Sequence, residues 1–306
     1  MKFTNKHNIP EEIISSIVSP KWYDKGDCDI SATGLLQPPR IRILSEQYKS
    51  QITQDYSDRV WMLLGSAIHA ILENSNQGTE NKITEERMYA EVDGVKIGGQ
   101  TDSICLKDSI VKDYKVTSVY AVKDCLKKGK IEWEQQLNIY AYLYSLNYDV
   151  DVSGLNIIAI CRDWNKSGLL RDRDYPKCPI VTIDINLWDK EKQLDFIKER
   201  VAIHEDADLL YMMSTSTGDL ILPECTDQET WKRDDVWAVK KKNRKTALRL
   251  LSSKEKAHTY IAEELGQQSD EMDLYIEHRK GEYVRCKSYC PVSDFCNQYK
   301  ESLGGI

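Results

Sequence analysis

Two acids and a lysine lie close together in the sequence GGQTDSICLKDSIVKDYK, residues 98–115. This segment predicts two strands joined by a tight turn at Lys107-Asp108. Counting outward from that turn places Asp102 directly opposite Asp113, and directly opposed residues project to the same face of a sheet. Lys115 joins this face because side chains alternate along a strand. Two carboxylates and an ammonium at a strand end indicate a divalent-metal site with a lysine beside the attacking water; the alternative is an exposed edge with solvated charges.

Two flanking segments carry further polar side chains. Residues 57–75, SDRVWMLLGSAIHAILENS, have apolar residues at helical spacing and predict a mostly buried helix, on which His69 and Glu73 lie one turn apart. Residues 131–147, IEWEQQLNIYAYLYSLN, predict a second helix with Gln136 and Tyr140 on one face. Polar residues in such positions are also common in ordinary cores, where they find hydrogen-bond partners, so this alternative stays open.

The elements that must position these residues follow from the pattern of apolar residues. Residues 82–118 predict three strands, with turns at Asp93-Gly94 and Lys107-Asp108. The apolar runs at 154–161 and 178–185 predict buried strands, and residues 188–213 predict a long helix. The remainder is less regular, with a hairpin around 236–251, a helix around 253–266 and a cysteine-rich tail. The sequence therefore predicts an α/β core, residues 1–213, and a C-terminal extension, residues 214–306, folded onto it.

Four short motifs occur in order along the predicted helix–strand–strand–helix segment. They are G-x-x-x-H from Gly65 to His69, G-G-x-x-D from Gly98 to Asp102, D-x-K from Asp113 to Lys115, and Q-x-x-x-Y from Gln136 to Tyr140. The set resembles the PD-(D/E)XK nuclease superfamily, and within it the RecB-like branch that includes CRISPR-associated iron–sulfur exonucleases and phage-type exonucleases. The resemblance covers roughly residues 30 to 145 and the cysteine tail.

This resemblance implies a restriction-endonuclease-like core, a central mixed β-sheet flanked by helices, and a role for each motif residue. The implied metal ligands are His69, Asp102, Asp113 and the backbone carbonyl of Tyr114; Lys115 would position the attacking hydroxide, and Gln136 and Tyr140 would orient Lys115 or the DNA. Glu73 is an additional candidate for a second metal or water contact. An imidazole among the ligands makes the site friendlier to Mn²⁺ than an all-oxygen site, and Mg²⁺ also fits.

Nine cysteines are many for a reduced compartment, and three of them lie in CKSYCPVSDFC, residues 286–296. Clustered thiols in a cytosolic protein more often bind a metal or a cluster than form disulfides. The relatives use three late cysteines and one distant cysteine for a [4Fe–4S] cluster, which implies Cys286, Cys290 and Cys296 here. The distant cysteine is displaced, because SATGLLQPPR has Pro38 at the corresponding place; Cys225 is the first choice and Cys28 the second. Four thiolates suit Zn²⁺ equally well, so zinc is the alternative.

The basic residues gain a candidate role if the chain acts on DNA. Arg40 and Arg42 in PPRIR, and Lys241 and Arg244 in KKKNRK, could line a DNA path. Each basic run is more often a solvated surface, and the net charge of −7 argues against a general nucleic-acid coat protein.

The composition bounds the class of protein. It is 41% hydrophobic and 30% charged, without an apolar run of membrane-spanning length or a secretory leader, which predicts a cytosolic protein, in the host cytosol if it is phage-encoded. The expected function is metal-dependent DNA exonuclease activity, on single-stranded DNA or DNA ends, in phage or bacterial replication, recombination or repair. The alternatives are a catalytically inactive nucleic-acid-binding or complex-assembly protein, and a structural metalloprotein.

Overall fold

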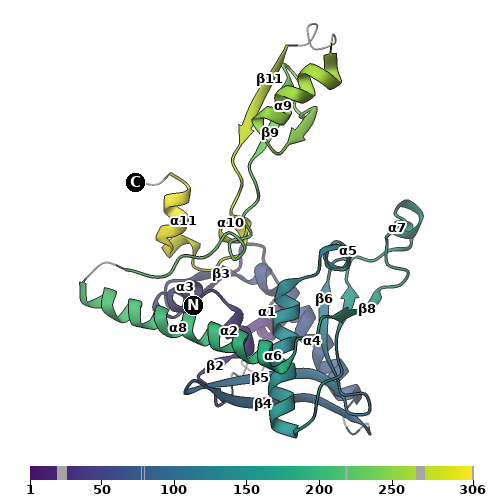
Figure 1. The fold of residues 1–306 in the computed structure, drawn as a ribbon, viewed down its shortest axis with the longest axis vertical. Coiled ribbons are helices and arrows are strands. Elements are labelled where there is room, and N and C mark those ends of the chain that lie inside the picture. The colour runs from purple at the N-terminus through teal and green to yellow at the C-terminus, as the bar shows by residue number, and fades with distance from the viewer. Residues whose placement is uncertain (19–25, 77, 79, 218–219, 267–272, 305–306) are drawn as a thin grey trace. The chain divides into compact units, whose positions relative to one another are not determined.

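The computed structural model describes residues 1–18, 26–76, 78, 80–217, 220–266 and 273–304 (Figure 1). Contacts within the chain divide it into unit 1, Met1–Leu222, and unit 2, Pro223–Ile306. The boundary that the sequence predicts, between residues 213 and 214, falls inside helix α8, Lys190–Thr217. The packing of the extension on the core stays a prediction.

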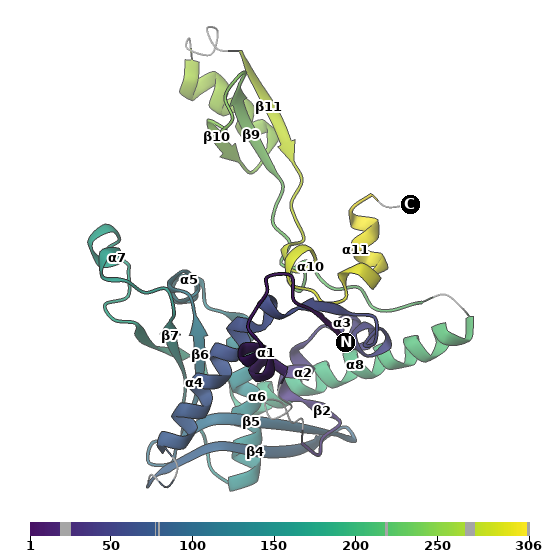
Figure 2. The ribbon, with the colours of Figure 1, turned by 180° about the vertical axis from the view of Figure 1, so that it is seen from behind.

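A six-stranded mixed sheet forms the centre of unit 1, in the order β2-β5-β6-β7-β8 with β4 paired to β5. The strands are β2 Ile30–Ser31, β4 Lys82–Val92, β5 Val95–Cys105, β6 Ile110–Thr117, β7 Gly154–Cys161 and β8 Ile180–Ile185. The β2–β5 and β6–β7 pairs are parallel and the other pairs are antiparallel. The predicted α/β class, with a mixed central sheet flanked by helices, is confirmed (Figure 2).

The helices of unit 1 lie around this sheet. They are α2 Ala32–Leu36, α3 Pro39–Gln47, α4 Val60–Asn76, α5 Val119–Lys128, α6 Ile131–Tyr148, α7 Lys166–Arg171 and α8 Lys190–Thr217. Before them come β1 Lys2–Thr4 and α1 Glu11–Val18; β3 Thr53–Asp55, which pairs with β1, and the 3₁₀ helix η2 Tyr56–Arg59 precede α4. No helix among the described residues is both long enough and apolar enough to span a bilayer.

The turn between β4 and β5 has the predicted form. Asp93 and Gly94 have φ angles of 51° and 82°, so both are left-handed, as a tight two-residue turn of a hairpin requires. Val92 pairs with Val95 directly beside the turn. The register of this hairpin therefore follows from the position of the Asp-Gly pair.

The turn between β5 and β6 is wider than predicted but keeps the predicted register. The chain turns over residues 106–109, and Cys105 pairs with Ile110. The expected pairing of Leu106 with Ser109 does not form; the Leu106 amide donates to Asn81 O at 2.8 Å, and Ser109 has a left-handed φ of 48°. A four-residue turn with the same centre as a two-residue turn leaves the strands in the same register.

Helix α6 supplies much of the core and approaches strand β5 closely. Trp133, Leu137 and Tyr144 of this helix are buried. A Cβ atom at Gly99 would lie 2.6 Å from Leu143 Cδ1 and 3.0 Å from Tyr140 Cδ1. The second glycine of the G-G-x-x-D motif is therefore required by the close approach of the helix to the strand.

Helix α4 is less buried than its sequence predicts. None of its residues is buried, and Trp61 and Ile71 are 60% and 63% exposed. The helix contacts β4, β6, η2 and α1. The expectation of a mostly buried helix was wrong, because its apolar residues are spread over more of the helix surface than the sheet covers.

Arg40 and Arg42 of helix α3 are used inside unit 1. Arg40 is buried and its guanidinium donates to Leu222 O at 2.6 Å. Arg42 donates to His204 Nδ1 at 3.0 Å and pairs with Asp208 at 2.7 Å on helix α8. The guanidinium groups of both arginines thus join α3 to other parts of unit 1, and their role in binding DNA stays a prediction.

Unit 2 begins with an irregular segment and contains a small three-stranded sheet in the order β10-β9-β11. Its elements are β9 Val236–Lys241, β10 Arg249–Leu251, α9 Lys254–Thr259, the π-helix η3 Tyr260–Leu265, β11 Leu274–Arg279, α10 Val284–Ser288, the 3₁₀ helix η5 Ser293–Phe295 and α11 Asn297–Ser302. The predicted hairpin and helix of this region are present, and β11 was not predicted.

We expect a pH-dependent loss of stability at His204. Its Nε2–H donates to Leu35 O at 3.1 Å while Nδ1 accepts from Arg42, and burial together with Arg42 and Arg200 lowers its pKa to about 4. Below its unfolded pKa of about 6.5 the unfolded chain binds a proton that the folded chain does not. The free energy of unfolding of the wild type, relative to His204→Gln, should fall by about 1 kcal/mol from about pH 7.5 to about pH 5.5.

Urea titrations at both pH values measure this difference. His7→Gln, which removes an exposed histidine of the same unit, is the control and should leave the pH dependence unchanged. A wild type and a His204→Gln variant that lose stability in parallel on acidification would contradict the assignment.

Candidate metal centre

Three carboxylates lie in a row across adjacent strands of the central sheet. The pairs next to these carboxylates fix the register of the strands. Between β4 and β5, Thr84 pairs with Ser103 and Glu86 with Thr101. Between β5 and β6, Ser103 pairs with Lys112. Continuing these ladders places Asp102 opposite Glu85 on one side and opposite Asp113 on the other. Like charges in directly opposed positions are destabilising unless positive charge compensates them.

His69 of helix α4 lies beside two of these carboxylates. Its Nδ1 is 3.1 Å from Asp102 Oδ1 and 3.8 Å from Glu85 Oε1, and its Nε2 is 3.0 Å from Tyr114 O. The ligand atoms of His69, Glu85 and Asp102 all lie within 4.8 Å of one another. Asp102 Oδ2 in turn accepts from the Tyr114 amide at 2.5 Å. These atoms are the nitrogen and oxygen donors that a divalent transition metal takes from a protein.

The carboxylates hold a proton on His69 when no metal is bound. Hydrogen bonds to Asp102 and then to Glu85 raise the pKa of His69 to about 10, against the opposing effect of its burial. The imidazolium is therefore the positive charge beside Asp102 and Glu85 at neutral pH. A metal held by Nδ1 would displace this proton, since metal ligation requires neutral imidazole.

The second cation of the site, Lys115, lies at the other end of the row. Its Nζ is 2.8 Å from Asp113 Oδ2 and donates to Gln136 Oε1 at 3.1 Å. Gln136 Nε2 donates to Tyr140 OH at 2.9 Å and approaches Asp113 Oδ1 at 3.4 Å. The structure thus brings Asp113, Lys115, Gln136 and Tyr140 together, with β6 and α6 supplying two residues each.

Burial dominates the electrostatics at this end. It raises the pKa of Asp113, which Lys115 lowers and Asp102 raises again. Burial likewise raises the pKa of the Tyr140 hydroxyl, so this group remains a neutral donor. An added cation at the row would favour the ionised form of Asp113, because opposite charge nearby stabilises a carboxylate.

Glu85 is the site residue that the sequence reasoning missed. It has a φ of 51° in the middle of β4, a left-handed conformation that is costly for a residue other than glycine. Its Oε2 accepts from Gln100 at 2.7 Å, and Gln100 Oε1 accepts from Arg87 at 2.6 Å. Counting outward from the Asp93-Gly94 turn would have placed Glu85 opposite Asp102, so a usable signal was present in the sequence.

The remaining candidates lie outside this group. Glu73, one turn after His69, is not part of the His69–Glu85–Asp102 group, and neither is the predicted ligand Asp113, although Asp113 lies opposite Asp102. Lys241 and Arg244 are exposed residues of unit 2, at the end of β9 and in the loop that follows it. Their role in binding DNA stays a prediction.

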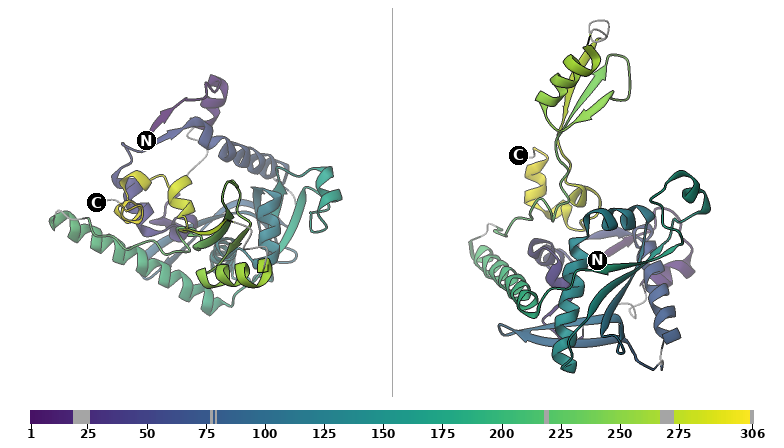
Figure 3. Two further views of the ribbon diagram at one scale, coloured as in Figure 1. Left: turned by 90° about the horizontal axis from the view of Figure 1, so that it is seen from above. Right: turned by 45° about the vertical axis from the view of Figure 1, so that its right-hand side comes forward.

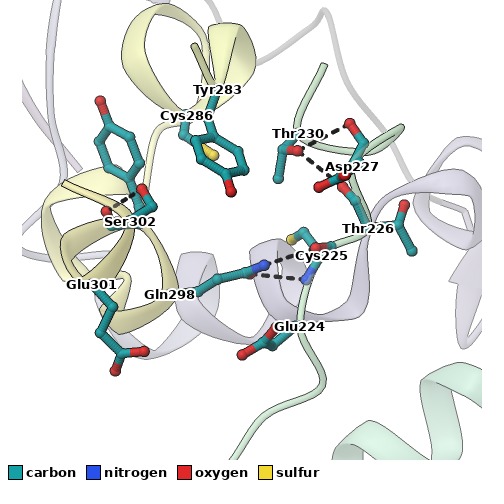
Figure 4. A pocket seen from close by; sticks show the side chains of 11 residues that line it. Glu224, Cys225, Thr226, Asp227, Thr230, Tyr283, Cys286, Gln298, Glu301 and Ser302 are labelled. Atoms are coloured by element: carbon teal, nitrogen blue, oxygen red, sulfur yellow. Dashed lines mark hydrogen bonds between the residues drawn. The ribbon is translucent and has the colours of Figure 1, made fainter. Parts of the chain in front are cut away.

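The candidate cluster cysteines lie in unit 2, around α10 and α11. Cys225 and Cys286 line a cavity of about 550 Å³ (Figure 4). Gln298 of α11 holds Cys225 in place by donating to its carbonyl at 2.7 Å and accepting from its amide at 2.9 Å. Burial, and then the nearby Cys290 and Cys296, raise the pKa of Cys286 to about 11. Cys225 and Cys286 share this cavity, but the cysteines among the described residues form no group of three or more ligands close enough together to hold one ion.

Cys28, the second choice for the distant ligand, lies in unit 1. It is buried, and a Cβ at Gly98 would lie 2.8 Å from its sulfur. The first glycine of the G-G-x-x-D motif therefore leaves room for this side chain beside β5.

Comparisons with known proteins yield only distant structural likeness. No family model matches the chain, and the search of curated proteins finds no match. The crystal structure of SSO0001 is 23% identical over 63% of this chain and 84% of its own, with a TM-score of 0.42. A crystal structure described as "Putative exonuclease" from Eubacterium rectale is 14% identical over 56% of this chain and 60% of its own, with a TM-score of 0.29. Both TM-scores lie below 0.5.

We expect Glu85→Gln to weaken Mn²⁺ binding. The substitution keeps the side-chain shape but removes one of the charges of the His69–Glu85–Asp102 group, so the affinity should fall about tenfold or more. Titration of Mn²⁺, followed by the electron paramagnetic resonance signal of the free ion, measures it. Glu91→Gln, an exposed position on the same strand, is the control and should bind as the wild type does. Equal affinities for wild type and Glu85→Gln would show that Glu85 is not a ligand.

Proposed function

We propose that this protein is a metal-dependent deoxyribonuclease that hydrolyses phosphodiester bonds. The observation that carries the proposal is the row Glu85–Asp102–Asp113 with His69 at one end and Lys115 at the other. An exposed, merely solvated strand edge would not bury Asp102 and Asp113, nor surround them with two cations from separate elements. The arrangement suits a site built to bind a cation next to a lysine.

The donor atoms fit Mn²⁺ or Mg²⁺. His69, Asp102 and Asp113, with the carbonyl of Tyr114, would hold the ion, and Glu85 adds an oxygen donor on the β4 side. The bound ion would lower the pKa of a water molecule and neutralise charge that develops on phosphate oxygens. The single nitrogen ligand favours Mn²⁺ more than an all-oxygen set would.

The side chains around Lys115 define its part in the reaction. Asp113 and Gln136 hold its ammonium at 2.8 Å and 3.1 Å, so the group is fixed before substrate arrives. A fixed ammonium can orient an attacking hydroxide and stabilise the oxyanion that forms at phosphorus. Tyr140 acts through Gln136, whose amide it accepts from, and is a positioning residue.

The substrate that we propose is DNA, single-stranded or with free ends, and the reaction is exonucleolytic. The preference for ends and the setting in phage or bacterial replication, recombination or repair come from the resemblance of the motifs to RecB-like nucleases. A cytosolic location agrees with that setting.

We further propose that Cys225, Cys286, Cys290 and Cys296 hold a [4Fe–4S] cluster, with Zn²⁺ as the alternative metal. What supports the proposal is the spacing of the three tail cysteines in the sequence and the cavity that Cys225 and Cys286 share. Bound metal would lower the raised pKa of Cys286 and Cys290, since the thiolate is the ligand. The cluster would tie α10 and α11 to the segment around Cys225.

Lys115→Ala should reduce hydrolysis of labelled single-stranded DNA about 100- to 1,000-fold in Mn²⁺, the usual effect of removing a donor to a developing oxyanion. Binding of Mn²⁺ and of DNA should persist, because neither depends on the ammonium. Lys112→Ala, on the same strand, is the matched control and should remain active. A Lys115→Ala variant with wild-type activity would rule out this mechanism, and a wild type without activity on any DNA would favour the binding or assembly role.

Anaerobically purified protein should be brown, the colour of an iron–sulfur centre, and Cys286→Ser should lose both colour and iron. The exposed Cys178, in unit 1, provides the control: Cys178→Ser should retain both. Colourless protein with about one bound zinc per chain would establish the alternative metal. Protein that contains neither metal would refute both assignments.

A further inference from the structure

Residues 236–266 and 273–279 of unit 2 belong to an inserted module between Cys225 and Cys286. Its three strands carry helix α9, and its two ends meet in a short stem. In the stem, the Arg233 amide donates to Glu282 O and the Arg285 amide to Thr230 O, each at 3.0 Å. A Cβ at Gly281 would lie 1.7 Å from Arg233 O, so this position requires glycine. The module is therefore a closed loop on the segment that carries the cysteines.

Positive charge is concentrated on one part of this module. From residue 240 to residue 256 the only acid is Glu255, against eight lysines and arginines, namely Lys240, Lys241, Lys242, Arg244, Lys245, Arg249, Lys254 and Lys256. Lys241, Arg244 and Lys245 are exposed, and none of them makes an ion pair with a residue that the structure describes. By contrast, Lys240 pairs with Glu277 at 3.2 Å and Lys242 with Asp273 at 2.9 Å. The strand end and loop after Lys240 thus carry three exposed cations, Lys241, Arg244 and Lys245, in addition to the two lysines that form ion pairs within the module.

Helix α9 lies over one face of the sheet (Figure 3). Arg249 is paired with Val239, and its guanidinium lies 5.6 Å from the ring centre of Tyr260, directly after α9, which places the helix on that face. Lys240 and Tyr275 are paired on the opposite face, where the Tyr275 side chain is 44% exposed. An exposed aromatic ring beside the basic loop offers a surface on which a base can stack.

The residues of the β9–β10 loop favour a nucleic-acid strand over a membrane surface as the polyanionic partner. Residues 240–246, KKKNRKT, contain no apolar side chain, so they lack the residues with which an amphipathic segment enters a bilayer. Lysines and an arginine next to an open aromatic residue match the phosphates and bases of a nucleic-acid strand.

We propose that the inserted module is a nucleic-acid docking surface, with Lys241, Arg244 and Lys245 on the phosphates and Tyr275 against a base. Docking there needs no hydrolysis at the metal centre of unit 1. The inference therefore stands apart from the proposed nuclease activity and can fail or hold independently of it.

The test is a binding titration of the full-length protein in EDTA, where metal-dependent cleavage cannot occur. The probe is a fluorescein-labelled single-stranded oligonucleotide of about 30 thymidines, long enough to exceed a typical binding site. Lys241→Gln/Arg244→Gln/Lys245→Gln should weaken binding at least about tenfold at low salt. The slope of log affinity against log salt should become shallower by about 2, because three phosphate contacts are lost. Tyr275→Ala should weaken binding with an unchanged slope.

A matched triple variant separates a local contact from a general effect of charge. Lys166→Gln/Arg171→Gln/Lys177→Gln removes the same charge from exposed positions of unit 1 and should change the affinity less than about twofold. Equal loss in the two triple variants, or no loss in the first, would overturn the proposal. Binding to phosphatidylserine vesicles that the first triple variant abolishes, with oligonucleotide binding intact, would overturn it in favour of a membrane surface.

Discussion

The site depends on the repulsion among three carboxylates in neighbouring strands of one sheet. Two such charges about 5 Å apart repel by about 3 kcal/mol at an effective dielectric constant of about 20, and Asp102 has a neighbour of this kind on each side. A fold can keep this row only if it places positive charge at fixed positions around it. The helices next to the sheet are therefore part of the electrostatics of the site as well as of the core.

Two helices meet this requirement in different ways. Helix α4 lies with much of its apolar surface exposed, yet it brings His69 to Asp102 and Glu85. Helix α6 is deeply buried, and its Gln136 fixes Lys115 next to Asp113. One cation of the row is an imidazolium whose proton a metal can displace, and the other is the ammonium of a lysine. The row therefore has one end suited to ligation and one end suited to stabilising an anion.

Much of this arrangement could be predicted from the sequence, because hairpin register follows from where a turn is centred. For this reason Asp102 lies opposite Asp113 as predicted, although the turn between them has four residues and not two. Counting from the Asp93-Gly94 turn would also have placed Glu85 opposite Asp102, but no motif drew attention to Glu85. Its left-handed backbone could not be predicted, because the surrounding sequence is typical of an ordinary strand. The burial of Arg40 could not be predicted, since its acceptor, Leu222 O, is distant in the sequence. The pairing of β9 with β11 joins strands that β10 and α9 separate in the sequence, and local patterns do not reveal it.

The stem of the inserted module lowers the entropic cost of bringing Cys225 and Cys286 together. Along the chain, Cys225 and Cys286 are far apart, and gathering their thiols would ordinarily require a long flexible loop to close, at an entropic cost that grows with loop length. The ladder from Arg233 to Glu282 already closes that loop with backbone hydrogen bonds. The effective loop between the thiols is then only the short chain on either side of the stem. A segment of this kind can lengthen, shorten or change its surface during evolution while the geometry of the thiols stays the same.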